Sequence, residues 1–223
     1  MYKRALVYLL LIISCHTLHA QLGEMKNNWA VGVNGGVGMN KVSFTPSIKQ
    51  KSYNTPTLGL TVRYISEKYF SMICGTQLEL NFTQRGWQED DTERVYSYSR
   101  KMNYLEIPFL FHAAFGKEKR GAQFFINAGP EINLLLSEKE VKKGDWTDVS
   151  GEQYGKLVDN RFDYGIIAGA GVEIKTGAGN FLLEGRYYYG LSDFYESGSS
   201  NYFDRSGHTT MTIKATFLFD LSQ

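Results

Sequence analysis

Hydrophobic and polar residues alternate with a period of two along most of this chain. Leu78, Leu80 and Phe82 take one set of alternate positions, while Glu79 and Asn81 take the other. Successive side chains of a β-strand point to opposite faces, so the pattern predicts strands with one apolar and one polar face. Eight segments carry the pattern, at residues 29–39, 57–66, 71–85, 102–115, 122–135, 162–176, 180–190 and 208–219.

The length of these segments changes what they predict. Most are ten residues or longer. A typical strand of a soluble protein has roughly 5–6 residues, whereas a tilted strand needs about 9–11 residues to cross a bilayer. Beyond the N-terminal region the sequence has no apolar run of about 18 residues, the length that a transmembrane helix requires. The strands themselves are therefore the predicted membrane-crossing elements.

Short and long connections alternate between the segments. If both ends of the chain lie on one side, every short connection falls on that side and every long one on the other. Outer-membrane barrels have this asymmetry, with short periplasmic turns and longer extracellular loops. The predicted fold is all-β, an eight-stranded antiparallel up-and-down transmembrane β-barrel. Its short connections lie at residues 67–68, 116–121 and 177–179, and its long ones at 40–56, 86–101, 136–161 and 191–207.

The polar faces of the predicted strands collect charges of both signs. An eight-stranded barrel has an interior just wide enough for side chains to fill, and unpaired charges in such a space are costly. We therefore expect a structural charge network that plugs the lumen. A solvated face of a soluble sandwich is the alternative. The five acids and four bases are Glu79, Glu106, Glu131, Glu173, Glu184, Arg63, Arg85, Arg186 and Lys214.

The N-terminus has the pattern of an export signal. Lys3 and Arg4 precede an apolar stretch at residues 5–13, and small residues follow up to Ala20. This arrangement predicts a secretory signal peptide rather than a membrane-spanning helix. The segment before Cys15 also resembles a lipobox, so lipidation of Cys15 stays open as an alternative. The predicted division is a signal peptide at 1–20 and a β-barrel domain at 21–223.

The composition supports strands and restricts the classes of function. Tyr (15), Phe (14) and Gly (23) are abundant and Pro (4) is scarce, which favours strands, turns and aromatic girdles at the membrane interfaces. The net charge of +1 gives no indication of nucleic-acid binding. Only Cys74 remains after cleavage at Ala20, so neither an internal disulfide nor a cysteine metal cluster is predicted.

Candidate catalytic residues are few. His112 is expected in the lumen bonded to a carboxylate, and His208 at the foot of a loop. Asp90, Asp91 and Glu93 form an acidic group in a long loop, but no sequence logic brings a histidine to them. Hydrolase, metalloprotease and phosphate-loop motifs do not occur in the sequence. We expect no enzymatic activity, no metal site and no cofactor.

The long connections also contain aromatic residues among charges. Exposed aromatic residues suit recognition of a protein or a glycan, and loops on a rigid scaffold often carry function. The same residues could instead cover one another as a cap over the barrel, and both interpretations stay open. The candidate recognition residues are Trp87, Tyr96, Tyr98, Trp146, Tyr154, Tyr195 and Tyr202.

Five stretches follow one another along the chain: the glycine-rich residues 29–39, YLEIPFL at 104–110, NAGPE at 127–131, GIIAGAGVE at 165–173 and RYYYGL at 186–191. In this order they resemble the PorT-like family of outer-membrane β-barrel proteins. The resemblance covers essentially all of the mature chain. It implies an eight-stranded barrel in the bacterial outer membrane but little about activity. The founding member of the family is associated with protein secretion, so the resemblance leaves a role in envelope assembly or secretion open. The chain departs from many such barrels in ending four residues after its last aromatic, Phe219.

The sequence therefore predicts a structural or interaction barrel of the outer membrane, with a plugged lumen and long extracellular loops. Its expected partners are outer-membrane lipid, the outer-membrane insertion machinery and envelope or secretion proteins, and not nucleic acid. A small pore or ligand-binding transporter is the main alternative. A membrane-embedded hydrolase and a soluble lipid-binding barrel are further alternatives.

Overall fold

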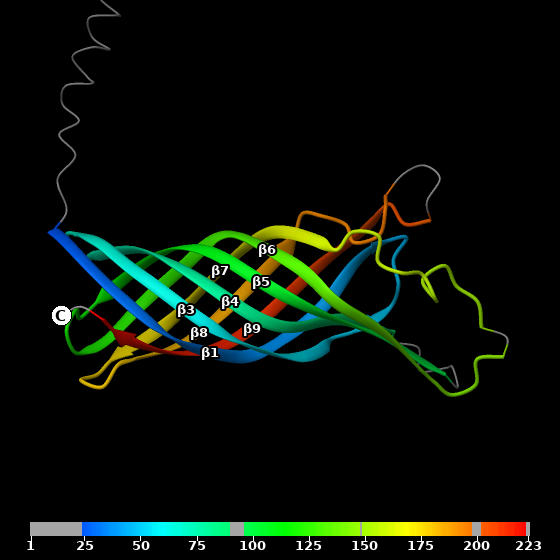
Figure 1. The fold of residues 1–223 in the computed structure, drawn as a ribbon, viewed down its shortest axis with the longest axis horizontal. Helices are drawn as coiled ribbons and strands as arrows, with labels where there is room; N and C mark the ends of the chain where they lie inside the picture. The colour runs from blue at the N-terminus through cyan, green and yellow to red at the C-terminus, as the bar shows by residue number, and fades with distance from the viewer. Residues whose placement is uncertain (1–23, 90–95, 148, 198–201, 222–223) are drawn as a thin grey trace, which may run out of the picture.

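Eight long antiparallel strands close into a barrel in the computed structural model, which describes residues 24–89, 96–147, 149–197 and 202–221 (Figure 1). A ninth, two-residue strand, β2 (Gln50–Lys51), lies outside the ring. The long strands are β1 (Glu24–Thr45), β3 (Tyr53–Tyr69), β4 (Met72–Glu89), β5 (Ser97–Gly116), β6 (Gly121–Lys143), β7 (Phe162–Lys175), β8 (Asn180–Gly190) and β9 (Arg205–Asp220).

The strands are joined in an up-and-down order. Each long strand pairs with its neighbours in the chain, β1 pairs with β9, and β2 adds only to the outer end of β4. The pairings confirm the predicted eight-stranded antiparallel barrel. Among the described residues, none belongs to a helix that could span a membrane.

The two ends of the barrel differ. The short turns β3–β4, β5–β6 and β7–β8 lie at one end together with Glu24 and Leu221, and we call this the turn end. The longer connections lie at the other, the loop end. The turn predicted at residues 67–68 is misplaced, since β3 continues to Tyr69 and the chain reverses at residues 70–71. A register shift between Ile65 and Glu67 breaks the alternation early and explains the error.

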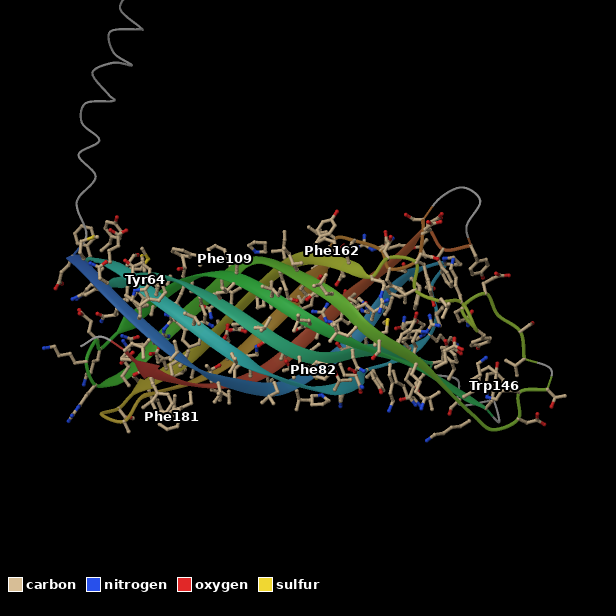
Figure 2. The ribbon with its side chains drawn as sticks, in the orientation of Figure 1. Tyr64, Phe82, Phe109, Trp146, Phe162 and Phe181 are labelled. Atoms are coloured by element: carbon tan, nitrogen blue, oxygen red, sulfur yellow. The ribbon has the colours of Figure 1, made fainter. Side chains whose placement is uncertain are left out.

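The outward face of the barrel is apolar, and the inward face is polar. Leu80 and Phe109 are 46% and 53% exposed, whereas Glu79 and Arg186 are 2% and 5% exposed. Phe82, Phe109 and Phe181 point away from the ribbon (Figure 2). This distribution is the reverse of that in a soluble barrel and is the one that a surrounding lipid phase requires.

The strands are longer than predicted at the loop end. The predicted loops 40–56, 86–101 and 136–161 are partly strand, because β1 reaches Thr45, β4 reaches Glu89 and β6 reaches Lys143. The predicted loop 191–207 is shortened by the start of β9 at Arg205. In this region the apolar side chains change sides: Trp87 and Tyr98 point inward and are fully buried. Because apolar residues point outward in one part of a strand and inward in another, their alternation does not show where the strand ends.

The outer parts of β4, β5 and β6 project beyond the rest of the barrel as a ribbon (Figure 1). Pairing between β6 and β7 ends at Leu134–Phe162, but pairing between β5 and β6 continues to Ser97–Lys143. The connection between β6 and β7 runs back from the ribbon to the barrel. The loop end is thus raised on one side.

Candidate functional site

The interior of the barrel contains three layers of charged side chains. The layer nearest the turn end joins β3 to β7, which lie on different sides of the ring. Both terminal nitrogens of Arg63 donate to the carboxylate of Glu173, each over 2.7 Å. A cluster of buried apolar side chains, among them Ile65, Phe125 and Leu218, lies in the same part of the interior. Because the pair is bidentate and buried, it ties the two walls together at this level.

The middle layer is centred on the carboxylate of Glu79. Arg186 donates to its two oxygens over 2.9 and 2.7 Å, and the Lys214 ammonium donates over 2.7 Å. Gln77 and Asn81 donate from the same strand over 2.7 and 3.0 Å. A second carboxylate, from Glu184, accepts from Arg186 over 2.7 Å. Two acids and two bases therefore neutralise each other across the lumen.

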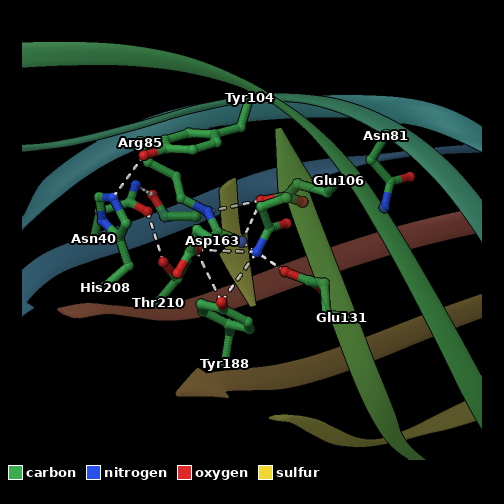
Figure 3. Close-up of polar contacts among 12 residues, drawn as sticks. Asn40, Asn81, Arg85, Tyr104, Glu106, Glu131, Asp163, Tyr188, His208 and Thr210 are labelled. Carbon is green, nitrogen blue, oxygen red and sulfur yellow. Dashed lines mark hydrogen bonds and ion pairs between the residues drawn. The ribbon is translucent and has the colours of Figure 1, made fainter. Parts of the chain in front are cut away.

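The upper layer surrounds the guanidinium of Arg85 (Figure 3). Its nitrogens lie 2.5 Å from a Glu106 oxygen, 2.6 Å from Glu131 and 3.2 Å from Asp163. The Tyr188 ring lies beneath the guanidinium at 4.2 Å, and its hydroxyl donates to Asp163 over 2.9 Å. Three carboxyl groups from β5, β6 and β7 thus converge on one cation from β4.

Little space is left between the upper and middle layers. A cavity of about 20 Å³ lies there, lined by residues that include Thr57, Asn81, Arg85, Arg186 and Lys214. A water molecule needs about 10–15 Å³ by this measure, so the cavity holds about one. The described side chains fill the rest of the lumen at this level.

An apolar aromatic cluster closes the loop end above the charged layers. We call it the cap: Val42, Phe44, Trp87, Tyr98, Met102, Tyr104, Leu135, Phe194, Tyr195 and Phe203, all buried. Trp87 stacks on Phe194 with ring centroids 5.7 Å apart. Ile48, Trp146, Tyr154 and Val158 pack against it from the connecting segments. The cap joins side chains of four long strands to side chains of the long connections, so it fixes the loops over the mouth.

One buried cation belongs to the cap. The Arg100 guanidinium lies 3.1 Å from Glu140 and 3.4 Å from Glu138, and it also donates to the Tyr195 hydroxyl and the Lys156 carbonyl. These contacts join β5 and β6 to the connections that follow β6 and β8. The buried guanidinium of Arg100 therefore holds these two connections in place over the barrel.

The nine charged residues singled out in the sequence all lie on the inward faces of the strands, and all are buried. The three layers bring them together in separate groups rather than in one network. Sequence reasoning missed Asp163 and Arg100, which are equally buried. Asp163 lies between the outward Phe162 and Tyr164, so alternation could have placed it in the lumen.

Three of the seven candidate recognition aromatics belong to the cap, and two more, Trp146 and Tyr154, pack against it. Trp87, Tyr98 and Tyr195 are fully buried, which removes them from any binding surface in this conformation. Tyr96, Trp146 and Tyr154 are partly buried. The rings of Trp146 and Tyr154 meet edge to face with centroids 5.0 Å apart, and the Tyr96 ring centroid lies 4.7 Å from that of Trp146. Tyr202 is 55% exposed. The cap interpretation therefore describes most of the set, and Tyr202 is its exposed member.

The histidines have structural surroundings. His112 Nδ1 lies 2.8 Å from the Asn127 amide oxygen, and His208 Nε2 lies 3.1 Å from the Tyr104 hydroxyl. Both rings are buried, and neither contacts a serine, cysteine or carboxylate in a way that would activate a nucleophile. The acidic residues at 90, 91 and 93 lie outside the described residues. In the described part of the chain no group of three metal-ligating side chains occurs.

A partly exposed charge cluster lies at the turn end. The Glu118 carboxylate lies between the ammonium groups of Lys26, at 2.8 Å, and Lys68. Hydrogen bonds from Lys26 and Lys68 lower the pKa of Glu118 to about 2. Glu118, Lys119, Arg120 and Lys175 line an open hollow of about 840 Å³ at this mouth. The hollow ends at the Arg63–Glu173 layer, so it does not continue through the barrel.

Comparisons with known proteins agree with this architecture. A model of the outer membrane protein beta-barrel domain matches residues 19–196. The crystal structure of OprG from Pseudomonas aeruginosa is similar over 88% of this chain and 98% of that chain, with a TM-score of 0.51 and 11% identity. At this identity the likeness shows the fold.

Two further solved structures are similar at lower scores. Ail, the attachment invasion locus protein of Yersinia pestis, has a TM-score of 0.38 and 13% identity over 87% of this chain and 100% of that one. The outer membrane enzyme PagL has a TM-score of 0.40 and 14% identity over 83% and 97%. No curated protein matches the sequence.

Proposed function

Since the chain belongs to the outer membrane protein beta-barrel domain family, we propose that it is a non-conducting scaffold of the bacterial outer membrane that presents its loop end to the outside. The turn end then faces the periplasm, as in other barrels of this kind. The function is one of structure and interaction, without catalysis. The observation that carries the proposal is the filled interior: three charged layers beneath an apolar cap.

The filled lumen argues against passage of solutes. A path through the barrel would have to break the Glu79–Arg186 pair and the contacts of Arg85 with three carboxyl groups. Removing one partner of a buried ion pair costs about 3–5 kcal/mol, because the other charge stays behind unpaired. Thermal motion alone therefore opens such a path only rarely. A small pore or ligand-binding transporter is the alternative function.

Conductance in planar lipid bilayers tests the proposal. We expect the refolded protein to insert without raising the ionic current above that of the bare bilayer. An open porin, inserted by the same protocol, is the positive control, and protease protection of the inserted protein shows that it has entered the membrane. Reproducible unitary current steps from the wild-type protein would support the transporter instead.

The loop end is the surface that we propose for interaction with envelope or secretion proteins. The projecting ribbon and exposed side chains such as Tyr202 are accessible there, whereas the buried cap aromatics hold the surface in shape. The PorT-like resemblance favours a partner in envelope assembly or secretion. Crosslinking through a photoreactive residue at Tyr202 in cells, compared with one at the exposed Phe70 in a turn of the opposite end, tests whether a partner contacts the loop end.

We further propose that residues 1–20 act as a secretory signal peptide and that the insertion machinery of the outer membrane assembles the barrel domain at 21–223. The positive and apolar residues of the N-terminus support export. Sequencing the N-terminus of the mature protein distinguishes cleavage after Ala20 from lipidation at Cys15.

A further inference from the structure

The outer face of β4, β5 and β6 is stratified at the loop end. Paired residues form three successive rows that cross these strands, each row further from the apolar band than the last. The pairing registers define the rows as Phe82–Leu105–Leu134, then Gln84–Asn103–Ser137, then Gly86–Lys101–Lys139. From the membrane outward, the side chains are therefore hydrocarbon, then amide and hydroxyl, then ammonium.

The middle row is held together by hydrogen bonds. The Gln84 amide donates to the Asn103 carbonyl oxygen over 3.1 Å, and the Asn103 amide donates to the Ser137 hydroxyl over 2.9 Å. These hydrogen bonds hold a row of polar side chains in place directly above the apolar row. Its chemistry suits the ester and amide region of a lipid monolayer, where hydrocarbon gives way to polar atoms.

The third row places two like charges side by side. Lys101 and Lys139 are directly paired across β5 and β6, an arrangement that destabilises a sheet when nothing neutralises it. Among the described residues, neither ammonium group makes an ion pair with a carboxylate. The outward positions of β5 and β6 contain no acidic residue at all. These strands therefore supply no counter-ion for the pair.

The height of the lysines above the apolar row fits a lipid headgroup. Two residues along a strand advance about 6.8 Å, and a tilt of about 40° reduces this to roughly 5 Å along the membrane normal. Two such steps place the lysine backbones about 10 Å above the row of Phe82, Leu105 and Leu134. A third cation lies nearby: exposed Arg161 donates to the carbonyl of Leu136 over 3.0 Å, beside the same strand.

We propose that Lys101 and Lys139 form a binding site for the phosphorylated headgroup of a lipid in the outer leaflet of the outer membrane. A phosphate between the ammonium groups supplies the missing negative charge, and the lipid chains lie on the apolar row below. Arg161 contributes a further positive charge at the edge of the site. The site requires only the outer face of the barrel and is independent of what happens at the cap.

Thermal unfolding in vesicles of defined composition tests this site. The protein is reconstituted into phosphatidylcholine vesicles containing either bisphosphorylated lipid A or the same lipid A without phosphates. The midpoint of heat modification on a gel is then measured. We expect the wild-type midpoint to be several degrees higher with the phosphorylated lipid. In the double variant Lys101→Gln/Lys139→Gln we expect this difference to fall by half or more.

Controls separate the site from general charge effects. The turn-end variant Lys117→Gln/Lys119→Gln removes the same charge from the opposite end and should keep the full difference. The variant Lys101→Arg/Lys139→Arg retains both charges and should keep it too, and it covers the case in which the glutamine variant refolds poorly. An equal response of wild-type and glutamine variant would refute the site. So would a wild-type shift that free inorganic phosphate reproduces in vesicles without lipid A.

Discussion

At the scale of single residues, Glu79 is the most heavily bonded carboxylate of the described lumen. Its two oxygens accept hydrogen bonds from Arg186, Lys214, Gln77 and Asn81. A carboxylate removed from water needs partners of this number and charge, because desolvation of an unpaired ion costs several kcal/mol. The middle layer is thus stable as a set, and each member depends on the others.

Replacement of Arg186 tests this dependence. We expect Arg186→Met to lower the free energy of unfolding by about 3 kcal/mol or more, because Glu184 and Glu79 both lose their guanidinium partner. Glu79→Gln should lower the free energy of unfolding by a similar amount, since Glu184 is then the one carboxylate left to neutralise Arg186 and Lys214. Equilibrium unfolding in urea, with the protein in lipid vesicles, measures both.

The double variant gives the sharper result. If the two residues act through each other, Glu79→Gln/Arg186→Met loses clearly less than the sum of the single losses. Lys119→Met, an exposed turn-end position, is the control and should change stability by less than about 0.5 kcal/mol. Strict additivity of the two lumen variants would contradict the paired arrangement.

The sequence allows the inward positions to be predicted residue by residue, but not their pairing. Alternation alone assigns Glu79 and Arg186 to the lumen, yet they are 107 positions apart and only the closed ring brings them together. Arg100 escapes prediction for a different reason. It lies in a stretch rich in Ser, Tyr and Lys, which is typical of a loop, although that stretch is a strand of the projecting ribbon.

At the scale of elements, the contact between β1 and β9 depends on glycine. A Cβ at Gly32 would lie 1.8 Å from the Phe217 carbonyl oxygen, far inside van der Waals contact. The two strands therefore approach each other more closely than a side chain at this position allows. At Gly185, on the outward face of β8, a Cβ would meet no atom within 4 Å apart from its own chain neighbours.

These two glycines make a matched test of strand closure. We expect Gly32→Ala to reduce the yield of folded, heat-modifiable barrel at least several-fold, because β1 must move away from β9. Gly185→Ala adds the same methyl group where there is room, and its yield should equal that of the wild type. Semi-native gel electrophoresis after refolding measures both. Equal yields would show that β1 and β9 adjust without cost.

The strand ends are the least predictable feature of the elements. Within the membrane band an apolar residue marks the outside, so the pattern assigns Leu80 and Phe82 correctly. Beyond it, water surrounds the strands, and apolar residues are more stable inside. Trp87 lies further along the same strand, in the part that water surrounds, and its side chain therefore points inward. A single hydrophobicity pattern cannot describe both regions, which is why it predicts a strand end at residue 85 rather than at Glu89.

At the scale of the whole molecule, the barrel combines two kinds of interior. The membrane-level interior is crossed by buried ion pairs with small apolar clusters beside them, and the cap is an apolar core of the kind found in soluble proteins. The two differ in what they stabilise. The charged layers join the walls of the barrel to one another, whereas the cap joins the walls to the loops.

Loss of one large side chain from the cap should separate these roles. We expect Trp87→Ala to release the segment around Lys156 while the membrane-level barrel stays folded. Truncation of a buried aromatic residue removes about 3–5 kcal/mol of local packing. The measurement is the rate of tryptic cleavage after Lys156 in intact vesicles, which should rise at least tenfold.

The exposed Tyr202 provides the comparison. Tyr202→Ala removes an aromatic side chain from the same end of the molecule without emptying the cap, and cleavage should proceed at the wild-type rate. Heat modification of both variants should remain unchanged. If Trp87→Ala instead abolished heat modification, the cap and the charged layers would form one cooperative unit.

The projecting ribbon has one further consequence. Beyond Leu134 no described strand pairs with the outer side of β6. Arg161 still bonds to the backbone of Leu135 and Leu136, so the open edge is the stretch from there to Lys143. An unpaired strand edge of this kind can pair with a strand of another molecule and so extend the sheet. Lys139, Lys142 and Lys143 line this edge, and a second molecule approaching edge to edge would bring the same cations against them. The repulsion between these lysines thus disfavours sheet pairing between two copies of the barrel through this edge.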